Sequence, residues 1–277
     1  QVIALEPLVE TDAKDLNISK SDVIVITGGG RGLGAKTALH LAKKHQCGLV
    51  LTGRSELSEA PEVAQTLKTI ESLGARAAYV CWDVQTPMLA EKLLAVQALG
   101  PVTGLIHCAG VIRDKRIDEK TISDLRTVFN TKALGLLNTM QGLEREPLRF
   151  MVGYSSWSGR FGNVGQTDYS AANEWLNRTL TFIGRERKDL AVTSVMWPPW
   201  EDSAMAQTIP APVRKAMESQ GVKFLSDEEG LELLDGILSG GVTGEILVGG
   251  RVSLETSTLS TSESISTLTH PYLEDHR

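Results

Sequence analysis

The feature that most constrains this 277-residue chain is a glycine-rich turn between a buried strand and a helix. Val23-Ile24-Val25-Ile26 is a short β-branched run, the pattern of a strand buried on both faces. The turn that follows it precedes apolar residues at helical spacing from Ala35 to Lys44. Glycines let the backbone approach a pyrophosphate, and free N–H groups at a helix start bind the anion. An ordinary tight turn is the alternative, but this context favours a dinucleotide site. Its expected residues are Thr27, Gly28, Gly30, Arg31, Gly32, Leu33 and Gly34.

Strand and helix patterns alternate along the chain from residue 22 to about residue 249. Short strands interleaved with helices indicate a parallel sheet, because each crossover between parallel strands carries a helix. We therefore expect an α/β fold, a Rossmann-like, doubly wound parallel sheet of about seven strands with helices on both faces. The expected strands are 22–27, 48–53, 76–81, 103–108, 147–154, 191–197 and 244–249, and the expected helices are 33–44, 61–73, 87–98, 121–141, 168–186 and 227–238.

The loop after the second expected strand indicates which nicotinamide cofactor would bind. About twenty residues past the glycine turn, a site selective for NAD places a carboxylate on the ribose 2′-hydroxyl. This chain has Arg54 there, with Ser55 beside it and Arg31 inside the turn. Guanidinium groups suit a 2′-phosphate, which a carboxylate would repel. The pattern predicts NADPH, and the alternative is that Arg54 is a solvated surface residue.

Two later segments fit the same cofactor. After the strand at 76–81, Asp83 can accept a hydrogen bond from the adenine amino group, and Val84 follows it. Ala109 and Gly110 follow the fourth strand, where small residues leave room for the cofactor to pass. We expect these four residues to contribute to the cofactor site.

Four polar residues have the types and spacing that carbonyl reduction needs. Ser156 precedes Tyr169 by thirteen positions, Asn173 follows Tyr169 by four, and Lys132 lies on the preceding helix pattern. Reduction by a nicotinamide needs a proton donor at the oxygen that receives negative charge. A phenol can give the proton, a hydroxyl can share the hydrogen bond, and a nearby ammonium can ease proton release. We predict that Tyr169 is the acid, assisted by Ser156, Lys132 and Asn173.

Composition narrows the class of protein further. The net charge of −6 argues against a nucleic-acid surface, and no apolar stretch is long enough to span a membrane. Cys47, Cys81 and Cys108 lack metal-ligand spacing, and the five histidines form no ligand cluster, so we expect no metal. The cysteines are typical of reduced, buried thiols in a cytoplasmic protein. His107 and Cys108, at a strand end, are interpreted as buried wall residues rather than catalytic ones.

The two ends fall outside the alternating pattern. Residues 1–20 are expected to be an N-terminal extension or inter-domain segment, and 21–250 the reductase domain. Residues 251–277 are a Ser/Thr-rich stretch with the composition of a linker. The chain begins with Gln1 rather than methionine and stops abruptly at Arg277, as expected of a piece of a longer polypeptide.

The quoted residues carry a family resemblance over about 22–250. The chain resembles the short-chain dehydrogenase/reductases, and more closely the ketoreductase domains of polyketide and polyunsaturated-fatty-acid synthases. The broader family places its lysine one turn after the tyrosine, where this chain has Asn173. The synthase ketoreductases are similar to this chain in carrying the lysine on the preceding helix, which matches Lys132. Residues 270–277 resemble the opening of a dehydratase domain, an order similar to that in iterative synthases of the enediyne and polyunsaturated-fatty-acid types.

The resemblance implies a function and its partners. It implies NADPH-dependent reduction of a 3-ketoacyl group held by phosphopantetheine on an acyl carrier protein, beside other synthase domains including a dehydratase. One alternative is a stand-alone reductase of small free ketones. The other is a catalytically silent NADPH-binding scaffold, against which the intact Ser156, Tyr169, Lys132 and Asn173 argue.

The resemblance also points to residues that contact the substrate side. Asp114 is the last residue of a fingerprint that is usually Leu-Asp-Asp, and position 161, which is tryptophan in the opposite stereochemical class, is Phe161. Trp157 is out of register for that role. These features imply a 3R alcohol. The segment from 200 to about 225 corresponds to a substrate lid, in which Met205, Met217 and Phe224 line an acyl tunnel or simply pack a surface loop.

Two further features concern neighbouring groups. The family commonly has Trp-Gly-Pro-Trp after its sixth strand, whereas this chain has Trp197-Pro198-Pro199-Trp200. The added proline removes a backbone donor on the nicotinamide side, where Pro198 is expected. Arg113, Lys115 and Arg116 follow the fourth strand and form the densest basic patch at the substrate rim. They are the candidate docking site for an acidic carrier, and a solvated loop without a partner is the alternative.

Overall fold

The computed structural model describes residues 16–249, except 208, 210 and 220–221. The expectations for residues 1–15 and 251–277 therefore lie outside the described residues. Of the proposed N-terminal extension, residues 16–20 are described, and Leu16 and Ile18 pack against the core of the sheet. Within the described part, no helix combines the length and the apolar character needed to cross a bilayer.

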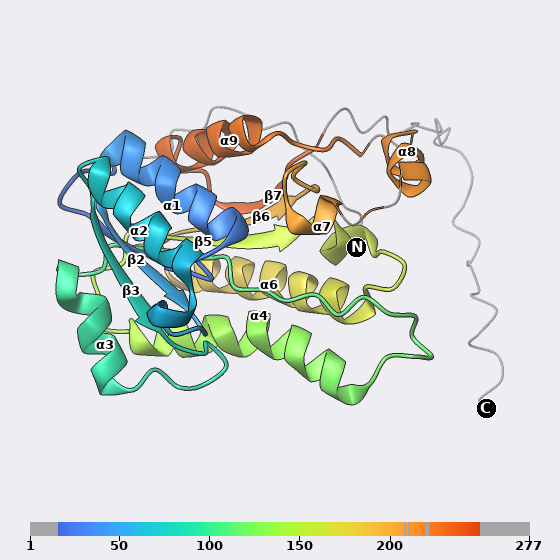
Figure 1. Ribbon diagram of the computed structural model, residues 1–277, viewed down its shortest axis with the longest axis horizontal. Coiled ribbons are helices and arrows are strands. Elements are labelled where there is room, and N and C mark those ends of the chain that lie inside the picture. Colours follow the sequence, from blue (N-terminus) through green and yellow to red (C-terminus); the bar gives the residue numbers. More distant parts are fainter. Residues whose placement is uncertain (1–15, 208, 210, 220–221, 250–277) are drawn as a thin grey trace.

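Seven strands form one sheet, in the order β3-β2-β1-β4-β5-β6-β7, and every neighbouring pair is parallel. Figure 1 shows this sheet between two layers of helices. The predicted doubly wound fold is confirmed. The strands are β1 (Val23–Thr27), β2 (Gly48–Gly53), β3 (Arg76–Cys81), β4 (Gly104–His107), β5 (Phe150–Ser156), β6 (Ala191–Trp197) and β7 (Gly244–Leu247).

Alternate residues of β1 supply both faces of the core. Ile24 and Ile26 belong to one hydrophobic cluster, and Val23 and Val25 belong to the other. All four are fully buried, because successive side chains of a strand point to opposite faces and both faces are covered. An unbroken β-branched run is therefore the pattern that this central strand requires.

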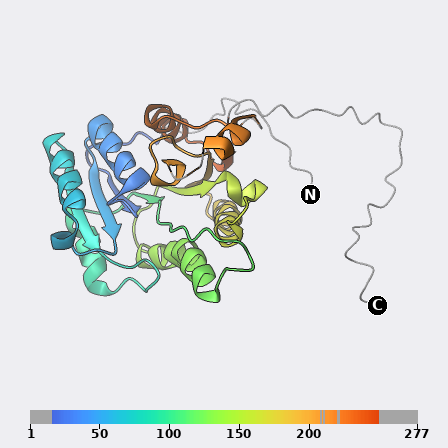
Figure 2. The same cartoon turned by 45° about the vertical axis from the view of Figure 1, so that its right-hand side comes forward.

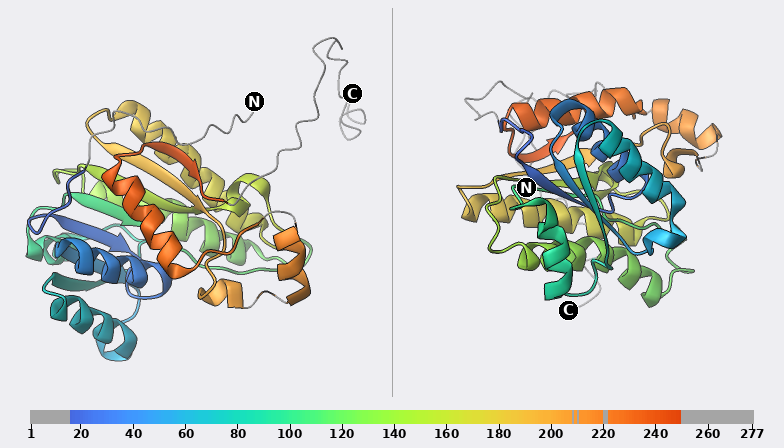
Figure 3. Two further views of the ribbon diagram at one scale, coloured as in Figure 1. Left: turned by 90° about the horizontal axis from the view of Figure 1, so that it is seen from above. Right: turned by 60° about the vertical axis from the view of Figure 1, so that its left-hand side comes forward.

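The helices divide between the two faces of the sheet (Figures 1 and 2). One cluster packs buried side chains of α1, α2 and α9 against the sheet, and the other packs those of α4 and α6. α1 and α9 lie side by side, as Figure 3 shows, and Lys36–Asp227 and His40–Asp235 contacts join them. The helices are α1 (Gly32–His45), α2 (Pro61–Ser72), α3 (Ala90–Val96), α4 (Ile122–Gly142), α5 (Trp157–Phe161), α6 (Thr167–Glu186), α7 (Ala204–Gln207), α8 (Ala211–Ser219) and α9 (Asp227–Ser239), with short 3₁₀ turns η1 (Leu57–Glu59) and η2 (Gln97–Leu99).

The larger differences from the sequence expectation lie at the third helix, at β5 and after β6. The third helix begins at Ala90 rather than 87, and its last turn is the 3₁₀ turn η2. β5 begins at Phe150 rather than 147, because the chain from Glu144 to Leu148 makes turn hydrogen bonds before it joins the sheet. The segment after β6, expected to be irregular, contains α7 and α8.

The strand order creates the place where a ligand can bind. The chain moves from β1 through β2 to β3 on one side, and then crosses to β4 on the other side of β1. At such a switch point, the loops after two neighbouring strands diverge and leave a crevice outside their carboxyl ends. The loops after β1 and β4 carry the glycine turn and the residues Ala109 to Asp114.

Candidate active site

A cleft of about 1240 Å³ lies along the carboxyl ends of the strands, between the glycine turn, the loop after β4 and the segment after β6. The structure brings most of the predicted site residues to it. Those that line it are Gly28, Gly30, Arg31, Gly32, Leu33, Gly34, Arg54, Ser55, Val84, Ala109, Gly110, Asp114, Lys132, Ser156, Trp157, Phe161, Tyr169 and Pro198.

The predicted residues outside this lining have identifiable positions. Thr27 and Asn173 are fully buried behind the wall of the cleft. The carboxylate of Asp83 accepts a hydrogen bond from the backbone N–H of Gln85 at 3.0 Å, within its own turn. The three basic residues proposed for docking follow β4 on the surface, where Lys115 pairs with Asp124 at 2.9 Å and Arg116 with Asp118 at 3.2 Å.

The glycine turn has the form of an anion cradle. Gly28 has φ +66°, and a Cβ there would lie 3.0 Å from the Cα of Ala109. A Cβ on Gly34 would lie 2.4 Å from the carbonyl oxygen of Gly28, so only glycine permits this close packing of helix on turn. The space above Gly32 is open, because its Cβ position meets no atom within 4 Å.

The start of α1 is available to such an anion. Arg31 occupies the N-cap position without a side-chain cap, and the first turn of the helix contains no acidic residue. The first backbone N–H groups of a helix need acceptors, and the helix dipole favours a negative charge there. The residues present therefore fit the pyrophosphate of a dinucleotide.

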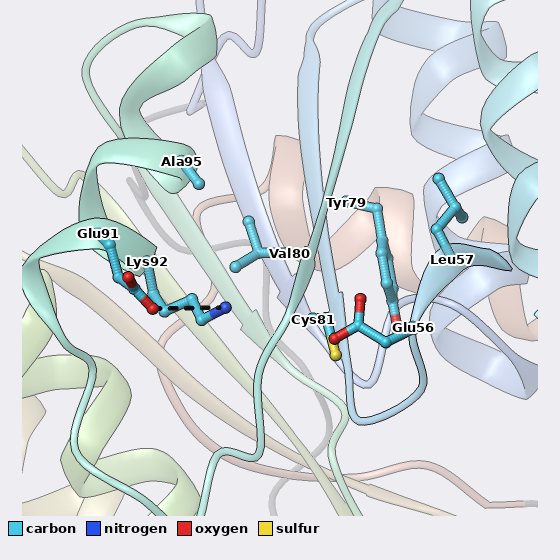
Figure 4. Close-up of a pocket in the computed structure, with 8 residues that line it drawn as sticks. All are labelled: Glu56, Leu57, Tyr79, Val80, Cys81, Glu91, Lys92 and Ala95. Carbon is cyan, nitrogen blue, oxygen red and sulfur yellow. Dashed lines mark ion pairs between the residues drawn. The ribbon is translucent and has the colours of Figure 1, made fainter. Parts of the chain in front are cut away.

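The far end of the cleft holds Arg54 and Ser55 on a supported loop. The Tyr79 hydroxyl donates to the carbonyl oxygen of Ser55 at 2.8 Å, and the Cys81 thiol donates to that of Arg54 at 3.4 Å. Figure 4 shows Tyr79 and Cys81 on β3, close to Glu56, among the residues that line a smaller hollow. The two β3 side chains thus fix the backbone that presents Arg54.

Arg31 lies at the same end of the cleft. Its guanidinium donates to the Ser55 hydroxyl at 3.5 Å and pairs with Glu62 at 2.5 Å, and both members of this ion pair are at least half exposed. Two arginines and a serine hydroxyl therefore line this end of the cleft.

Tyr169 and Asn173 lie one turn apart on α6. The side-chain amide of Asn173 donates to the carbonyl oxygen of Tyr169 at 2.8 Å, and its Oδ1 is buried without a hydrogen-bond partner among the described residues. Burial raises the pKa of the Tyr169 phenol above its usual value, while the side chains of Asn173 and Ser156 counteract this and the charge of Asp114 adds to it. The phenol therefore stays protonated at neutral pH and can act as an acid.

Ser156 ends β5 and caps α5. Its hydroxyl oxygen accepts hydrogen bonds from the backbone N–H of Ser158 at 3.2 Å and from the Ser158 hydroxyl at 3.1 Å. Because both of these bonds use Ser156 as the acceptor, its own proton is available to an acceptor in the cleft.

Lys132 is held inside the wall of the cleft. Its Nζ donates to the carbonyl oxygen of Tyr154 on β5 at 2.8 Å, and burial lowers its pKa from 10.5 to about 8. A Cβ on Gly110 would lie 3.4 Å from this nitrogen, so the glycine leaves room for the ammonium. At pH 7 the side chain carries its charge in a largely water-free environment.

His107 fixes the backbone beside Lys132. Its Nε2 contacts the carbonyl oxygen of Lys132 at 3.1 Å, and its Nδ1 contacts the Thr27 hydroxyl at 2.8 Å. Burial lowers the pKa of His107 to about 3, so the ring is neutral. Since a carbonyl only accepts, Nε2 carries the proton and Nδ1 accepts from Thr27. The expectation that His107 is a buried wall residue is confirmed. Cys108 is half-buried and lines the cleft.

The substrate end of the cleft joins two loops. The side-chain amide of Gln166 donates to the carboxylate of Asp114 at 2.8 Å. Phe161 is 56% exposed at the mouth, and its ring lies 5.4 Å from that of Trp157. The Trp157 indole N–H donates to the carbonyl oxygen of Val248, which directs Trp157 toward the end of β7.

The segment after β6 is anchored by its tryptophans. Trp200 is fully buried, packs edge-on against Trp197 at 5.2 Å and pairs in a β-bridge with Leu225. Met217 lines the cleft. Phe224 is instead buried under the guanidinium of Arg214, which lies 4.2 Å from its ring. The side chain of Met205 lies outside the described part.

Sequence reasoning missed several contributors to the site. Tyr79, Tyr154 and Gln166 all line the cleft, and each acts through a contact to a residue far away in the sequence. No local sequence spacing predicts such contacts, since they form only when the strands and loops assemble. The sequence did place Tyr79 and Tyr154 on predicted strands, and this position was the available indication that they could contribute to the site.

Residues 23–202 match the KR domain family. The chain belongs to this family of ketoreductase domains. It is therefore an oxidoreductase with the short-chain dehydrogenase fold, and the ketoreductase assignment made from Lys132, Tyr169 and Asn173 is confirmed at the family level. The roles of the individual residues remain predictions.

Relatives and solved structures agree with this assignment. A polyunsaturated fatty acid synthase component from a Thraustochytrium species is 28% identical over 100% of this chain and 12% of its own length. Polyketide synthase PksL of Bacillus subtilis is 31% identical over 82% of this chain and 5% of its own length. A ketoreductase domain from the bacillaene assembly line has a TM-score of 0.74 at 29% identity, covering 87% of this chain and 59% of its own. A short-chain dehydrogenase from Burkholderia cenocepacia, solved in complex with NADP, has a TM-score of 0.74 at 22% identity over 84% of this chain and 98% of its own, and shares the fold.

This chain therefore spans only a small part of the length of those two synthase relatives.

Proposed function

We propose that this chain reduces the 3-keto group of an acyl chain that an acyl carrier protein carries on phosphopantetheine, with NADPH as the reductant. One observation carries this proposal. Tyr169, Ser156 and Lys132 line the same cleft as the glycine turn and Arg54, so proton-donating groups and a dinucleotide cradle share one cavity. Membership of the KR domain family supports the same reaction. The synthase relatives support a place within a polyketide or fatty-acid synthase, with other synthase domains including a dehydratase as neighbours.

The protein's own groups handle the ketone oxygen. NADPH, when bound, supplies the hydride that adds to C3. The Ser156 hydroxyl, whose oxygen already accepts from Ser158, donates to the ketone oxygen and orients it. Tyr169 donates the proton, which its raised pKa keeps on the phenol at neutral pH. The Lys132 ammonium stabilises the negative charge left on the phenol.

Proton return uses the buried amide on α6. Within the part of the chain that the structure describes, the Oδ1 atom of Asn173 has no hydrogen-bond partner, although a buried acceptor without one is costly. A water molecule donating to this oxygen would satisfy it, and the same water can pass a proton toward Tyr169. Asn173 therefore serves to hold the proton relay in our proposal.

The cofactor end supports NADPH over NADH. Arg54 and Arg31 supply the positive charge that a 2′-phosphate needs, and the Tyr79 and Cys81 hydrogen bonds hold the Arg54 loop in place. The ribose 2′-hydroxyl of NADH offers no charge for the two guanidinium groups. The predicted adenine contact of Asp83 belongs to the same proposal, as do the pyrophosphate contacts of the glycine turn.

Configuration of the product is expected to be set at the substrate end. Asp114 lines the cleft, Phe161 occupies the mouth where the opposite class has tryptophan, and Trp157 is tied to Val248. We expect the 3R alcohol, which a following dehydratase can process. The free thiols of the chain fit a reducing compartment, and the cytoplasm is our expected location.

The test is NADPH oxidation with a 3-ketoacyl thioester presented on a carrier protein, on pantetheine and as a small free ketone, followed by chiral analysis of the alcohol. We expect kcat/KM to fall in that order, with a 3R product. Equal kcat/KM for free ketones and the carrier-bound thioester would favour a stand-alone reductase. Absence of oxidation with NADPH bound would indicate a silent scaffold.

A further inference from the structure

A buried ion pair lies at the substrate end of the cleft, outside the proposed catalytic set. Lys120, just before α4, and Asp168, in the first turn of α6, have side chains that are 3% and 0% exposed. The Lys120 Nζ donates to the carboxylate Oδ1 of Asp168 at 2.8 Å. Charged side chains are almost never buried this completely unless they are paired.

Each member of the pair also holds a backbone group. The Lys120 Nζ donates to the carbonyl oxygen of Arg113 at 2.8 Å, next to Asp114. The Oδ1 of Asp168 accepts from the backbone N–H of Tyr169 at 2.9 Å. Two buried charges therefore connect the backbone beside Asp114 to the backbone of the proposed proton donor.

Two further contacts join the same segments. The Gln166 amide donates to the Asp114 carboxylate at 2.8 Å, and the Lys115 backbone N–H donates to the carbonyl oxygen of Gly165 at 3.1 Å. Asp114 is also close enough for its charge to raise the pKa of Tyr169. The loop after β4 and the loop before α6 thus meet along a continuous line of hydrogen bonds at the mouth of the cleft.

We propose that Lys120 and Asp168 are positioning residues that hold the 113–115 stretch against the start of α6 and so set how a ketone stands relative to Tyr169. This inference rests on the proposed reduction, because it concerns substrate placement in that reaction. Neither side chain lines the cleft, so neither is expected to touch the substrate. Losing the pair would release Asp114 and the mouth while leaving the glycine turn and Arg54 in place.

A pair of variants separates positioning from stability. Removing one buried charge leaves the other without its partner and strongly destabilises the fold. Replacing both charges with uncharged groups often leaves the stability of the fold nearly unchanged. Lys120→Met and Asp168→Asn alone should each lower Tm by roughly 10 °C. The double variant should recover most of that loss, because the amide introduced by Asp168→Asn keeps an oxygen that can accept from the Tyr169 N–H. It still lacks the bond to the Arg113 carbonyl.

We expect the double variant to keep its stability and cofactor affinity but to lose substrate affinity and stereoselectivity. Its Tm and its Kd for NADPH should stay near the wild-type values, while KM for the 3-ketoacyl thioester rises about tenfold. The proportion of the minor enantiomer in the product should also increase. The control is Arg187→Met/Asp189→Asn, which removes an exposed ion pair of 2.7 Å just before β6, at the amino ends of the strands. The control should change none of these quantities.

The outcomes are distinguishable. A double variant with wild-type Tm, KM and enantiomer ratio would overturn the positioning role and leave a purely structural pair. If the double variant does not fold, Lys120→Arg decides, because it keeps the charge but displaces the donor. Its KM should rise at least threefold at unchanged Tm, and an unchanged KM and enantiomer ratio would overturn the proposal. A wild-type protein that reduces no thioester would overturn the proposed function itself, whatever the variants do.

Discussion

Lys132 shows how a single residue is tuned by the strands around it. Its ammonium donates to the Tyr154 carbonyl, its own carbonyl is held by His107, and burial brings its pKa to about 8. The chemistry of carbonyl reduction predicts an ammonium near Tyr169, and the family resemblance points to the same lysine on the preceding helix, although a lysine inside a helix pattern is usually a solvated residue. The pKa follows from burial, which the sequence alone does not specify.

The first prediction is a pH profile that reports Lys132. Below pH 8 the side chain is charged, and it loses its proton as pH rises through about 8, so the phenolate left on Tyr169 loses its stabilising cation. The rate of ketone reduction at saturating NADPH should therefore be flat near pH 6–7 and fall above about pH 8. In Lys132→Met this inflection should vanish and the plateau should drop about 100-fold. A wild-type-like inflection in the variant would assign the titration to another group.

The second prediction concerns Arg54. Arg54→Asp should raise KM for NADPH at least about tenfold and change KM for NADH far less, because a carboxylate repels the 2′-phosphate. The matched control is Lys188→Asp, the same change of charge at an exposed residue before β6. If Arg54→Asp leaves the NADPH-to-NADH ratio of kcat/KM unchanged, Arg54 is a surface residue only.

At the scale of elements, periodicity predicted the long helices and buried strands well, and tertiary contacts decided the rest. α4 and α6 lie within one residue of their expected bounds. α5 was not predicted, because it has only five residues and packs against α6, where a Cβ on Gly159 would lie 3.0 Å from Asn173. The Lys120–Asp168 pair could not be predicted from the sequence either, since a single charged residue in a sequence usually indicates a solvated side chain.

Two glycines of α9 give the third prediction. A Cβ on Gly230 would lie 2.4 Å from the Trp200 ring, whereas the Cβ position of Gly236 is open. Gly236→Ala should stabilise the fold by about 0.5–1 kcal/mol through helix propensity. Gly230→Ala should instead destabilise it by about 1–3 kcal/mol, because Trp200, which anchors the segment after β6, must move. Denaturant unfolding measures the free energy of unfolding of each variant. Equal changes in the two variants would show that Trp200 can move at no cost in stability.

At the scale of the whole molecule, charge limits how the proposed carrier protein could dock. The chain has a net charge of −6, so long-range attraction to an acidic carrier needs a local basic patch. The structure pairs Lys115 with Asp124 and Arg116 with Asp118, which lowers the net charge of the candidate patch. Arg113 is exposed, and its guanidinium donates to an uncharged group, the carbonyl oxygen of Ile112, at 3.3 Å.

The fourth prediction tests this patch. Reversing Arg113, Lys115 and Arg116 to glutamate should raise KM for a carrier-bound substrate, and more so at low salt, where charges are less screened. It should leave kcat/KM for a pantetheine thioester nearly unchanged. An equal loss on both substrates would indicate damage to the cleft, and no loss on either would leave the patch without a docking role.

The most direct test of the proposed reduction follows a deuterium label from the cofactor to the product. NADPH deuterated at the transferred position is mixed with a 3-ketoacyl thioester, and the alcohol is analysed by mass and on a chiral column. We expect one deuterium at C3 of a 3R alcohol. We also expect that Tyr169→Phe, which removes only a hydroxyl, binds NADPH with unchanged Kd and forms this product about 100-fold more slowly or worse. A product without deuterium, or a Tyr169→Phe rate within about threefold of wild type, would contradict the proposed reduction.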